Sequence, residues 1–180
     1  MSRLDFDYEP KCCPKKYLPN LANFLTADGF QKKTLNLKFR RNINNKDTRG
    51  QPNDLFGCNS LLVLICTRMN QIIGGFTSIE LEKGCKDYIR DDESFIFSLS
   101  KNEKFKIKKN SASEAIFMTP DYLLCFSNDL MISVDCVKSQ SQSDWPCAFE
   151  SGAEKRNSRW LTGEEGAFSI KEIEVYEVKE

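Results

Sequence analysis

Residues 61–99, LLVLICTRMNQIIGGFTSIELEKGCKDYIRDDESFIFSL, alternate long apolar segments with turn residues more sharply than the rest of the chain. Residues 61–66 are apolar at every position, which predicts a central strand covered on both faces. Residues 67–70 form a polar connection of hairpin length, so residues 71–79 are predicted to return beside the first strand. The stretch therefore predicts an antiparallel hairpin at the centre of a sheet.

Two adjacent glycines interrupt the returning strand. Gly74 and Gly75 lack a Cβ and weaken a strand, so we expect a bulge or the close approach of another backbone at this point. Further along, Phe95, Phe97 and Leu99 alternate with serine and isoleucine, which predicts a third strand that is half buried.

Length and composition indicate one globular domain. The chain has 180 residues, of which 40% are hydrophobic and 29% are charged, enough for a single core. Its formal net charge is +0, whereas nucleic-acid binders usually carry a basic excess. No apolar run is long enough to cross a bilayer, and the first residues do not resemble a signal peptide. We therefore expect a cytoplasmic protein without nucleic-acid binding or membrane insertion.

The chemistry of the chain argues against an enzyme. It contains eight cysteines without a Cys-x-x-Cys pair and no histidine, so a Cys/His zinc site and a histidine-activated nucleophile are excluded. No phosphate-binding loop is present, and we expect neither a metal nor a cofactor. Cys85, between Gly84 and Lys86, is the cysteine whose neighbour suggests reactivity toward peroxide.

The N-terminal part differs in pattern from the rest. We expect residues 1–17 to be an irregular arm and residues 18–180 to be a single domain. Apolar residues recur at helical spacing over residues 18–25, which predicts a short helix ended by Asp28 and Gly29.

Two further segments have readable patterns. Leu35, Leu37 and Phe39 alternate with polar residues, which predicts a strand with one face in the core. Residues 138–159 are polar and without periodicity, and they predict a long surface loop. Within this loop we expect Trp145 to pack back on the domain, the alternative being an exposed anchor for recognition.

Short elements are predicted elsewhere. Residues 51–59 predict a small helix that begins near a proline. Leu130, Ile132 and Val134 alternate and predict a strand that presents them on one face. A change of phase in the last strand predicts a bulge near residues 171–172.

The order of these segments resembles the TLDc domain, the module of the oxidation-resistance proteins. The likeness rests on the glycine pair with its following aromatic, the Phe-Ile-Phe-Ser-Leu segment, the Asp-Leu pair and the ending Glu-Ile-Glu-Val-Tyr. The chain departs from the family pattern at Ile73, where an aromatic is usual, and by lacking glycines between Phe126 and Asp129. The residues that match the family's fold motifs are Gly74, Gly75, Phe76, Phe95, Phe97, Asp129, Leu130, Glu174 and Val175.

The resemblance implies both a fold and a role. The fold would be mainly β, in the α+β class: a two-sheet antiparallel β-sandwich with a few short flanking helices. The chain would be a nearly bare module with no second domain before it. Its role would be that of a non-catalytic protein-interaction module, linked to oxidative-stress resistance and to regulation of the vacuolar proton-pumping ATPase. Alternatives are a building block of a larger protein assembly and a thiol protein that reacts with peroxide.

Overall fold

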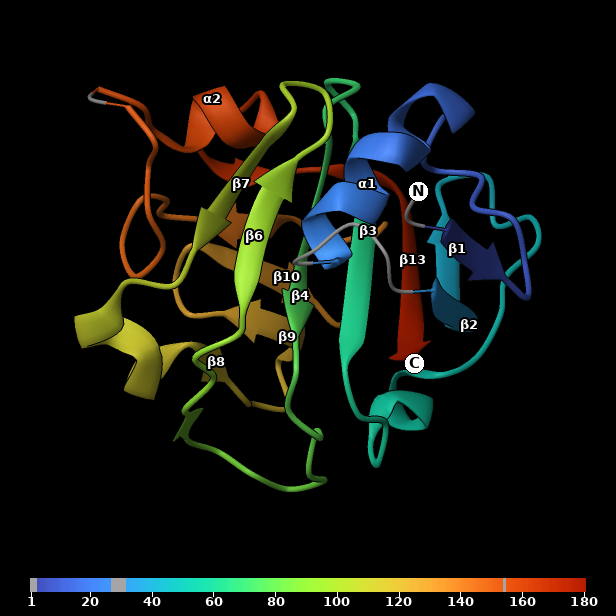
Figure 1. Ribbon diagram of the computed structural model, residues 1–180, viewed down its shortest axis with the longest axis horizontal. Helices are drawn as coiled ribbons and strands as arrows, with labels where there is room; N and C mark the ends of the chain where they lie inside the picture. Colours follow the sequence, from blue (N-terminus) through green and yellow to red (C-terminus); the bar gives the residue numbers. More distant parts are fainter. Residues whose placement is uncertain (1–2, 27–31, 154) are drawn as a thin grey trace.

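The centre of the fold is the predicted hairpin, formed by β3 (Leu61–Thr67) and β4 (Ile72–Thr77). A computed structural model describes residues 3–26, 32–153 and 155–180. In these residues two sheets pack face to face with short helices at their margins (Figure 1). The predicted mainly β, two-sheet sandwich is confirmed.

Seven strands form the larger sheet, in the order β1 (Arg3–Phe6), β2 (Lys32–Asn42), β13 (Ile170–Lys179), β3, β4, β6 (Phe95–Ser98) and β7 (Glu103–Lys106). Six form the smaller sheet, in the order β12 (Gly166–Phe168), β11 (Ser141–Ser143), β10 (Leu130–Ser133), β9 (Tyr122–Phe126), β8 (Ile116–Phe117) and β5 (Tyr88–Ile89). The helices are α1 (Leu18–Leu25), α2 (Ser158–Thr162) and the 3₁₀ helices η1 (Lys15–Tyr17), η2 (Pro52–Leu55) and η3 (Lys109–Glu114). The described strands pair antiparallel except β1, which lies parallel to β2.

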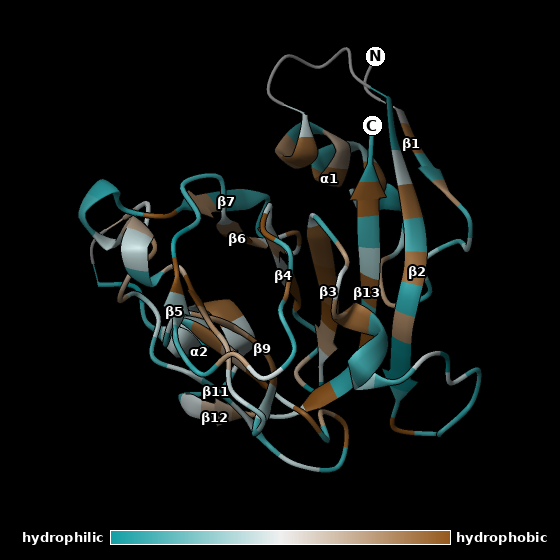
Figure 2. Cartoon of the chain, turned by 90° about the horizontal axis from the view of Figure 1, so that it is seen from below, coloured by the Kyte–Doolittle hydropathy of each residue, from teal (hydrophilic) through white to brown (hydrophobic). Residues whose placement is uncertain are grey.

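The centre of the larger sheet is buried on both faces. Alternate residues of β3 face opposite ways: Val63 belongs to the core between the sheets, whereas Leu64 belongs to a second core under α1 and the N-terminal arm. Figure 2 shows α1 and the smaller sheet on opposite sides of this sheet. The two cores explain why β3 is apolar at every position, as the sequence predicted.

The strand β2 does not keep one face in the core. Leu37 lies opposite Tyr176, but Phe39 lies opposite Val175, so Lys38 is an extra residue without a partner on β13. This bulge turns Phe39 into the core between the sheets, while Leu37 stays in the second core. The prediction of a single buried face is therefore wrong.

The predicted bulge in the last strand is present, since the pairing of β13 with β3 shifts between Ile170 and Glu172. The bulge expected at the glycine pair is not, because Gly74 and Gly75 pair regularly with Leu64 and Val63. The expected close approach of another backbone is observed at Gly74, next to the Val63 carbonyl oxygen, whereas at Gly75 the close group is the Phe126 side chain.

Strand β6 is fully buried, so the prediction of a half-buried strand is wrong. Ile96 lies in the core between the sheets, and Phe95 and Phe97 lie in the second core. The second face is covered because α1 packs there, with the rings of Phe24 and Phe97 5.8 Å apart.

The N-terminal arm, expected to be irregular, contains two regular elements within residues 3–17. It contributes β1 and η1, and its Cys12 and Cys13 side chains are buried in the second core. The arm is ordered because its apolar residues cover a sheet face that would otherwise meet water. Helix α1 has the predicted extent, but the predicted stop at Asp28 and Gly29 lies outside the described residues.

The described residues of the segment 138–159 also include regular elements, where one long surface loop was predicted. It contains β11 and ends in the first residues of α2. Trp145 is only 2% exposed, its ring lies 4.9 Å from that of Phe105, and its Nε1–H donates to the carbonyl oxygen of Glu150. The prediction that Trp145 packs on the domain is confirmed. Val134, expected on one strand face with Leu130 and Ile132, instead lies beyond β10 and is exposed.

Candidate functional site

The family-motif residues do not form one site. Gly74, Gly75 and Phe76 lie in β4, Phe95 and Phe97 in β6, Asp129 and Leu130 at the β9–β10 turn, and Glu174 and Val175 in β13. Their contacts are internal: for example, the rings of Phe76 and Phe95 stack at 5.3 Å, and Leu130 and Val175 belong to the core between the sheets. These residues therefore contribute to the packing of the domain at several places and do not form a binding centre.

Asp129 holds a loop in place. Its buried carboxylate accepts hydrogen bonds from the backbone N–H groups of Cys147 and Ala148, both at 2.7 Å, and of Phe149 at 3.3 Å. Burial raises the pKa of this carboxyl, although the three donors oppose the shift. The residue therefore has a structural role, in tying residues 147–149 to the smaller sheet.

We expect Asp129→Asn to lower the free energy of unfolding by about 1–3 kcal/mol at neutral pH, since an amide nitrogen replaces one acceptor oxygen. Folding raises the pKa of this carboxyl above its ordinary value of 3.8. The raised pKa therefore stabilises the folded protein fully at pH values below 3.8, and this stabilisation is lost as the pH rises through the folded-state pKa. Urea unfolding of both proteins at acid and neutral pH should thus show a larger difference at acid pH. An equal or smaller difference at acid pH would contradict the assignment.

Glu174 is the centre of a buried polar network. Its carboxylate accepts hydrogen bonds from the Lys11 backbone N–H (3.0 Å), the Cys12 thiol (3.1 Å) and the Tyr176 hydroxyl (3.3 Å). The Arg40 Nε lies 3.3 Å from it, and the Arg40 guanidinium also pairs with Glu172. This network attaches the arm to β13.

The buried thiols are poor nucleophiles. Burial raises the pKa of Cys13, Cys125 and Cys136 to about 12, and that of Cys12 well above its ordinary value. A thiol with a raised pKa holds little thiolate at neutral pH. Over residues 3–26, 32–153 and 155–180, no group of three or more Cys, Asp or Glu side chains is placed to hold a metal ion.

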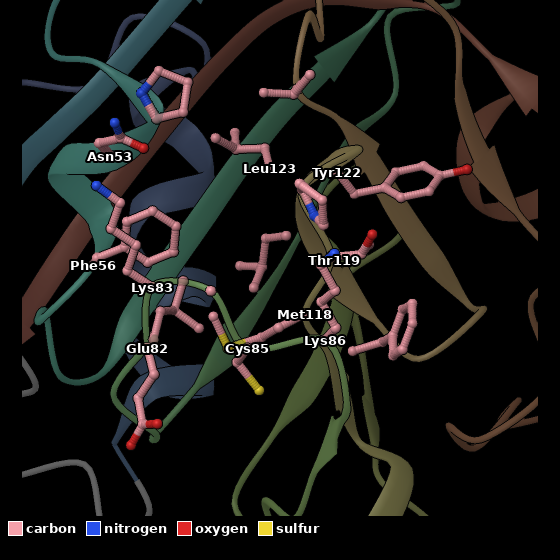
Figure 3. A pocket seen from close by; sticks show the side chains of 17 residues that line it. Asn53, Phe56, Glu82, Lys83, Cys85, Lys86, Met118, Thr119, Tyr122 and Leu123 are labelled. Atoms are coloured by element: carbon pink, nitrogen blue, oxygen red, sulfur yellow. The ribbon is translucent and has the colours of Figure 1, made fainter.

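One cavity of about 320 Å³ opens at the end of the sandwich, and we call it the end pocket (Figure 3). Its walls are η2, the loop of residues 81–86 and the β8–β9 turn, at the lower end of the molecule in Figure 1. Its lining residues are Pro52, Asn53, Phe56, Leu81, Glu82, Lys83, Gly84, Cys85, Lys86, Phe117, Met118, Thr119, Pro120, Tyr122, Leu123, Leu124 and Val134.

The sequence did not predict the end pocket. Its walls come from separate segments of the chain, and a lining residue such as Leu81 follows no local pattern that marks a cavity. The one sequence signal was indirect: Cys85, singled out for its neighbour Lys86, lies in this wall.

These observations define a β-sandwich domain with an apolar cavity at one end. A family profile described as the TLDc domain matches residues 6–179, and the chain belongs to the TLDc domain family. The resemblance seen in the sequence is thereby confirmed. No curated protein matches the chain. Among the described helices, none has the length and apolar character needed to span a membrane.

Proposed function

We propose that the chain is a non-catalytic protein-interaction module that acts in the cytoplasm, contributes to oxidative-stress resistance and regulates the vacuolar proton-pumping ATPase by binding to it. The observation that supports this is the family match over residues 6–179. A module of this kind acts through its surface, and the end pocket offers an apolar cavity there.

The chemistry of the residues supports binding rather than turnover. The sequence contains no histidine, the commonest general base at neutral pH. The buried carboxylates of Asp129 and Glu174 are occupied by internal donors, as described above. Four of the thiols have pKa values far above neutrality because they are buried.

The binding part of the proposal is tested with the purified chain and purified vacuolar ATPase. We expect a stoichiometric complex by size-exclusion chromatography, and a change in ATP hydrolysis or in assembly state when the chain is added. Absence of a complex would contradict the proposal. Recovery from native extract in a stoichiometric scaffold instead of the pump would favour the building-block alternative.

The non-catalytic part is tested with peroxide. We expect the purified chain to consume no more than a few equivalents of hydrogen peroxide, because none of its buried thiols is readily ionised. Cys85→Ser should not change this low consumption, and Cys147→Ser, which removes the exposed thiol, is the matched control. Consumption over many equivalents that Cys85→Ser abolishes and Cys147→Ser preserves would establish the thiol enzyme instead.

A further inference from the structure

We propose that the end pocket is the docking site for an extended segment of a partner protein that inserts one bulky apolar side chain and places acidic residues beside it. The inference rests on the proposed function, because it assigns the partner-binding site of an interaction module. Four features of the pocket support it: its size and lining, the exposed apolar residues around it, the charge at its mouth and the bonds between its walls.

The size and lining suit one large apolar side chain. A volume of about 320 Å³ is at the lower end of the range of about 300–1,000 Å³ for ligand sites. Leu81, Met118 and Leu124 line the cavity and are buried, so the site is apolar at depth. Binding hot spots of protein interfaces are typically aromatic or other large side chains in a desolvated pocket of this kind.

Exposed apolar residues gather at this end of the molecule. Four large hydrophobic side chains are exposed in the described part of the chain, and two of them are here. Val134 is 41% exposed and lines the pocket, and Tyr88 lies with its ring 4.6 Å from that of Phe117, which also lines it. The apolar surface therefore continues beyond the cavity. A polypeptide segment would contact this surface on both sides of the inserted side chain, whereas a small ligand would fill only the cavity.

The lining residues include two lysines and one glutamate, which are Lys83, Lys86 and Glu82. Figure 3 shows the Glu82 carboxylate directed away from the cavity, while the Lys83 side chain runs past Phe56 toward Asn53. Neither lysine forms an ion pair with any described residue. Unpaired cations beside an apolar cavity complement acidic residues next to an apolar anchor.

The walls are held together by backbone hydrogen bonds. The Gly57 N–H donates to the Leu81 carbonyl oxygen at 3.0 Å, which joins the end of η2 to the loop. The Met118 N–H donates to the Asp87 carbonyl oxygen at 3.1 Å, which joins the loop to β8. Walls that are joined to one another have less freedom to lose when a ligand binds.

The experiment uses fluorescein-labelled synthetic peptides and the whole chain. The test peptides are Gly-Ser-Glu-Asp-Phe-Asp-Glu-Ser-Gly and the same sequence with leucine at its centre. One control peptide has serine at the centre, and another has lysine in place of every acidic residue. We expect fluorescence polarisation to show saturable binding of at least one test peptide below about 1 mM, with both control peptides at least about tenfold weaker.

Matched variants locate the binding. Val134→Glu should weaken binding by at least about tenfold, whereas Ile43→Glu should not, because Ile43 is equally exposed (42%) but does not line the pocket. Lys86→Glu should weaken binding and Lys106→Glu should not, since Lys106 is exposed on β7. These side chains are exposed, so each variant should fold, which circular dichroism checks.

Each contrary outcome overturns the proposal. It fails if no test peptide binds, if the serine or lysine peptide binds equally well, or if Ile43→Glu weakens binding as much as Val134→Glu. The outcome is separable from that of the proposed function. Pump binding that Val134→Glu leaves unchanged would refute the end pocket and keep the function, whereas peptide binding without pump binding would do the reverse.

Discussion

Gly75→Val is expected to destabilise the fold by about 3 kcal/mol, at the upper end of the usual cost of overpacking a core. Gly75 is in β4, and a Cβ built on it would lie 2.6–2.9 Å from three atoms of the Phe126 ring. Such distances are shorter than any normal carbon contact, so the ring or the strand would have to move. Because Phe126 is buried in the core between the sheets, little space exists for that movement. Thermal and urea unfolding would measure the loss.

Two comparisons identify the cause of the loss. Gly84→Val serves as the control, since no atom lies within 4 Å of its Cβ and its cost is only the left-handed backbone strain of about 1–2 kcal/mol. Phe126→Leu shortens the group that Gly75→Val would strike. The double variant should therefore be more stable than the sum of the two single losses predicts. Strict additivity would show that the ring is not responsible.

The neighbouring glycine is restricted for a different reason. A Cβ on Gly74 would lie 2.0 Å from the carbonyl oxygen of Val63 and 2.6 Å from the Phe97 ring. The two glycines thus face opposite cores, one toward the smaller sheet and one toward α1. The sequence predicted either a bulge or the close approach of another backbone at these glycines. It could not show that two aromatic rings, one from each core, also pack against them.

The central hairpin and the positions of several strands could be predicted from local pattern, and the errors in their predicted burial have identifiable physical causes. The β3–β4 hairpin has a strong apolar pattern and a short polar turn, which suffice to predict it. The face of Phe39 depends on a bulge against β13, whose pairing residues lie more than a hundred positions away. The burial of β6 depends on α1, and no alternation within β6 can reveal a cover on its second face.

The candidate site was less predictable than the fold. The motif residues could be placed in order, but the structure shows them as internal packing and hydrogen-bonding groups, as for Asp129. The end pocket is assembled by tertiary contacts between loops, and Cys85 was the one lining residue singled out in the sequence for its chemistry. Cavities of this kind depend on packing geometry, which periodicity does not encode.

Arg40→Met is expected to lower the free energy of unfolding by about 3 kcal/mol, the cost typical of leaving a buried charge without its partner. Arg40 is 2% exposed and Glu174 is fully buried, so solvent cannot replace the lost ion pair. The same change should loosen the arm, because Glu174 also accepts the Lys11 backbone N–H. Hydrogen exchange at the Lys11 amide should accelerate in the variant. Arg68→Met is the control, since Arg68 is exposed and its side chain forms no ion pair with any described residue.

A second substitution distinguishes a lost ion pair from lost packing. If the penalty arises from an uncompensated charge at Glu174, neutralising that charge with Glu174→Gln should recover part of it. The double variant should then be more stable, by at least about 1 kcal/mol, than the sum of the single effects predicts. If the penalty arises only from the packing of the Arg40 side chain, the two effects should add. Additive losses, together with unchanged exchange at the Lys11 amide, would show that the arm is held by its apolar contacts and not by Glu174.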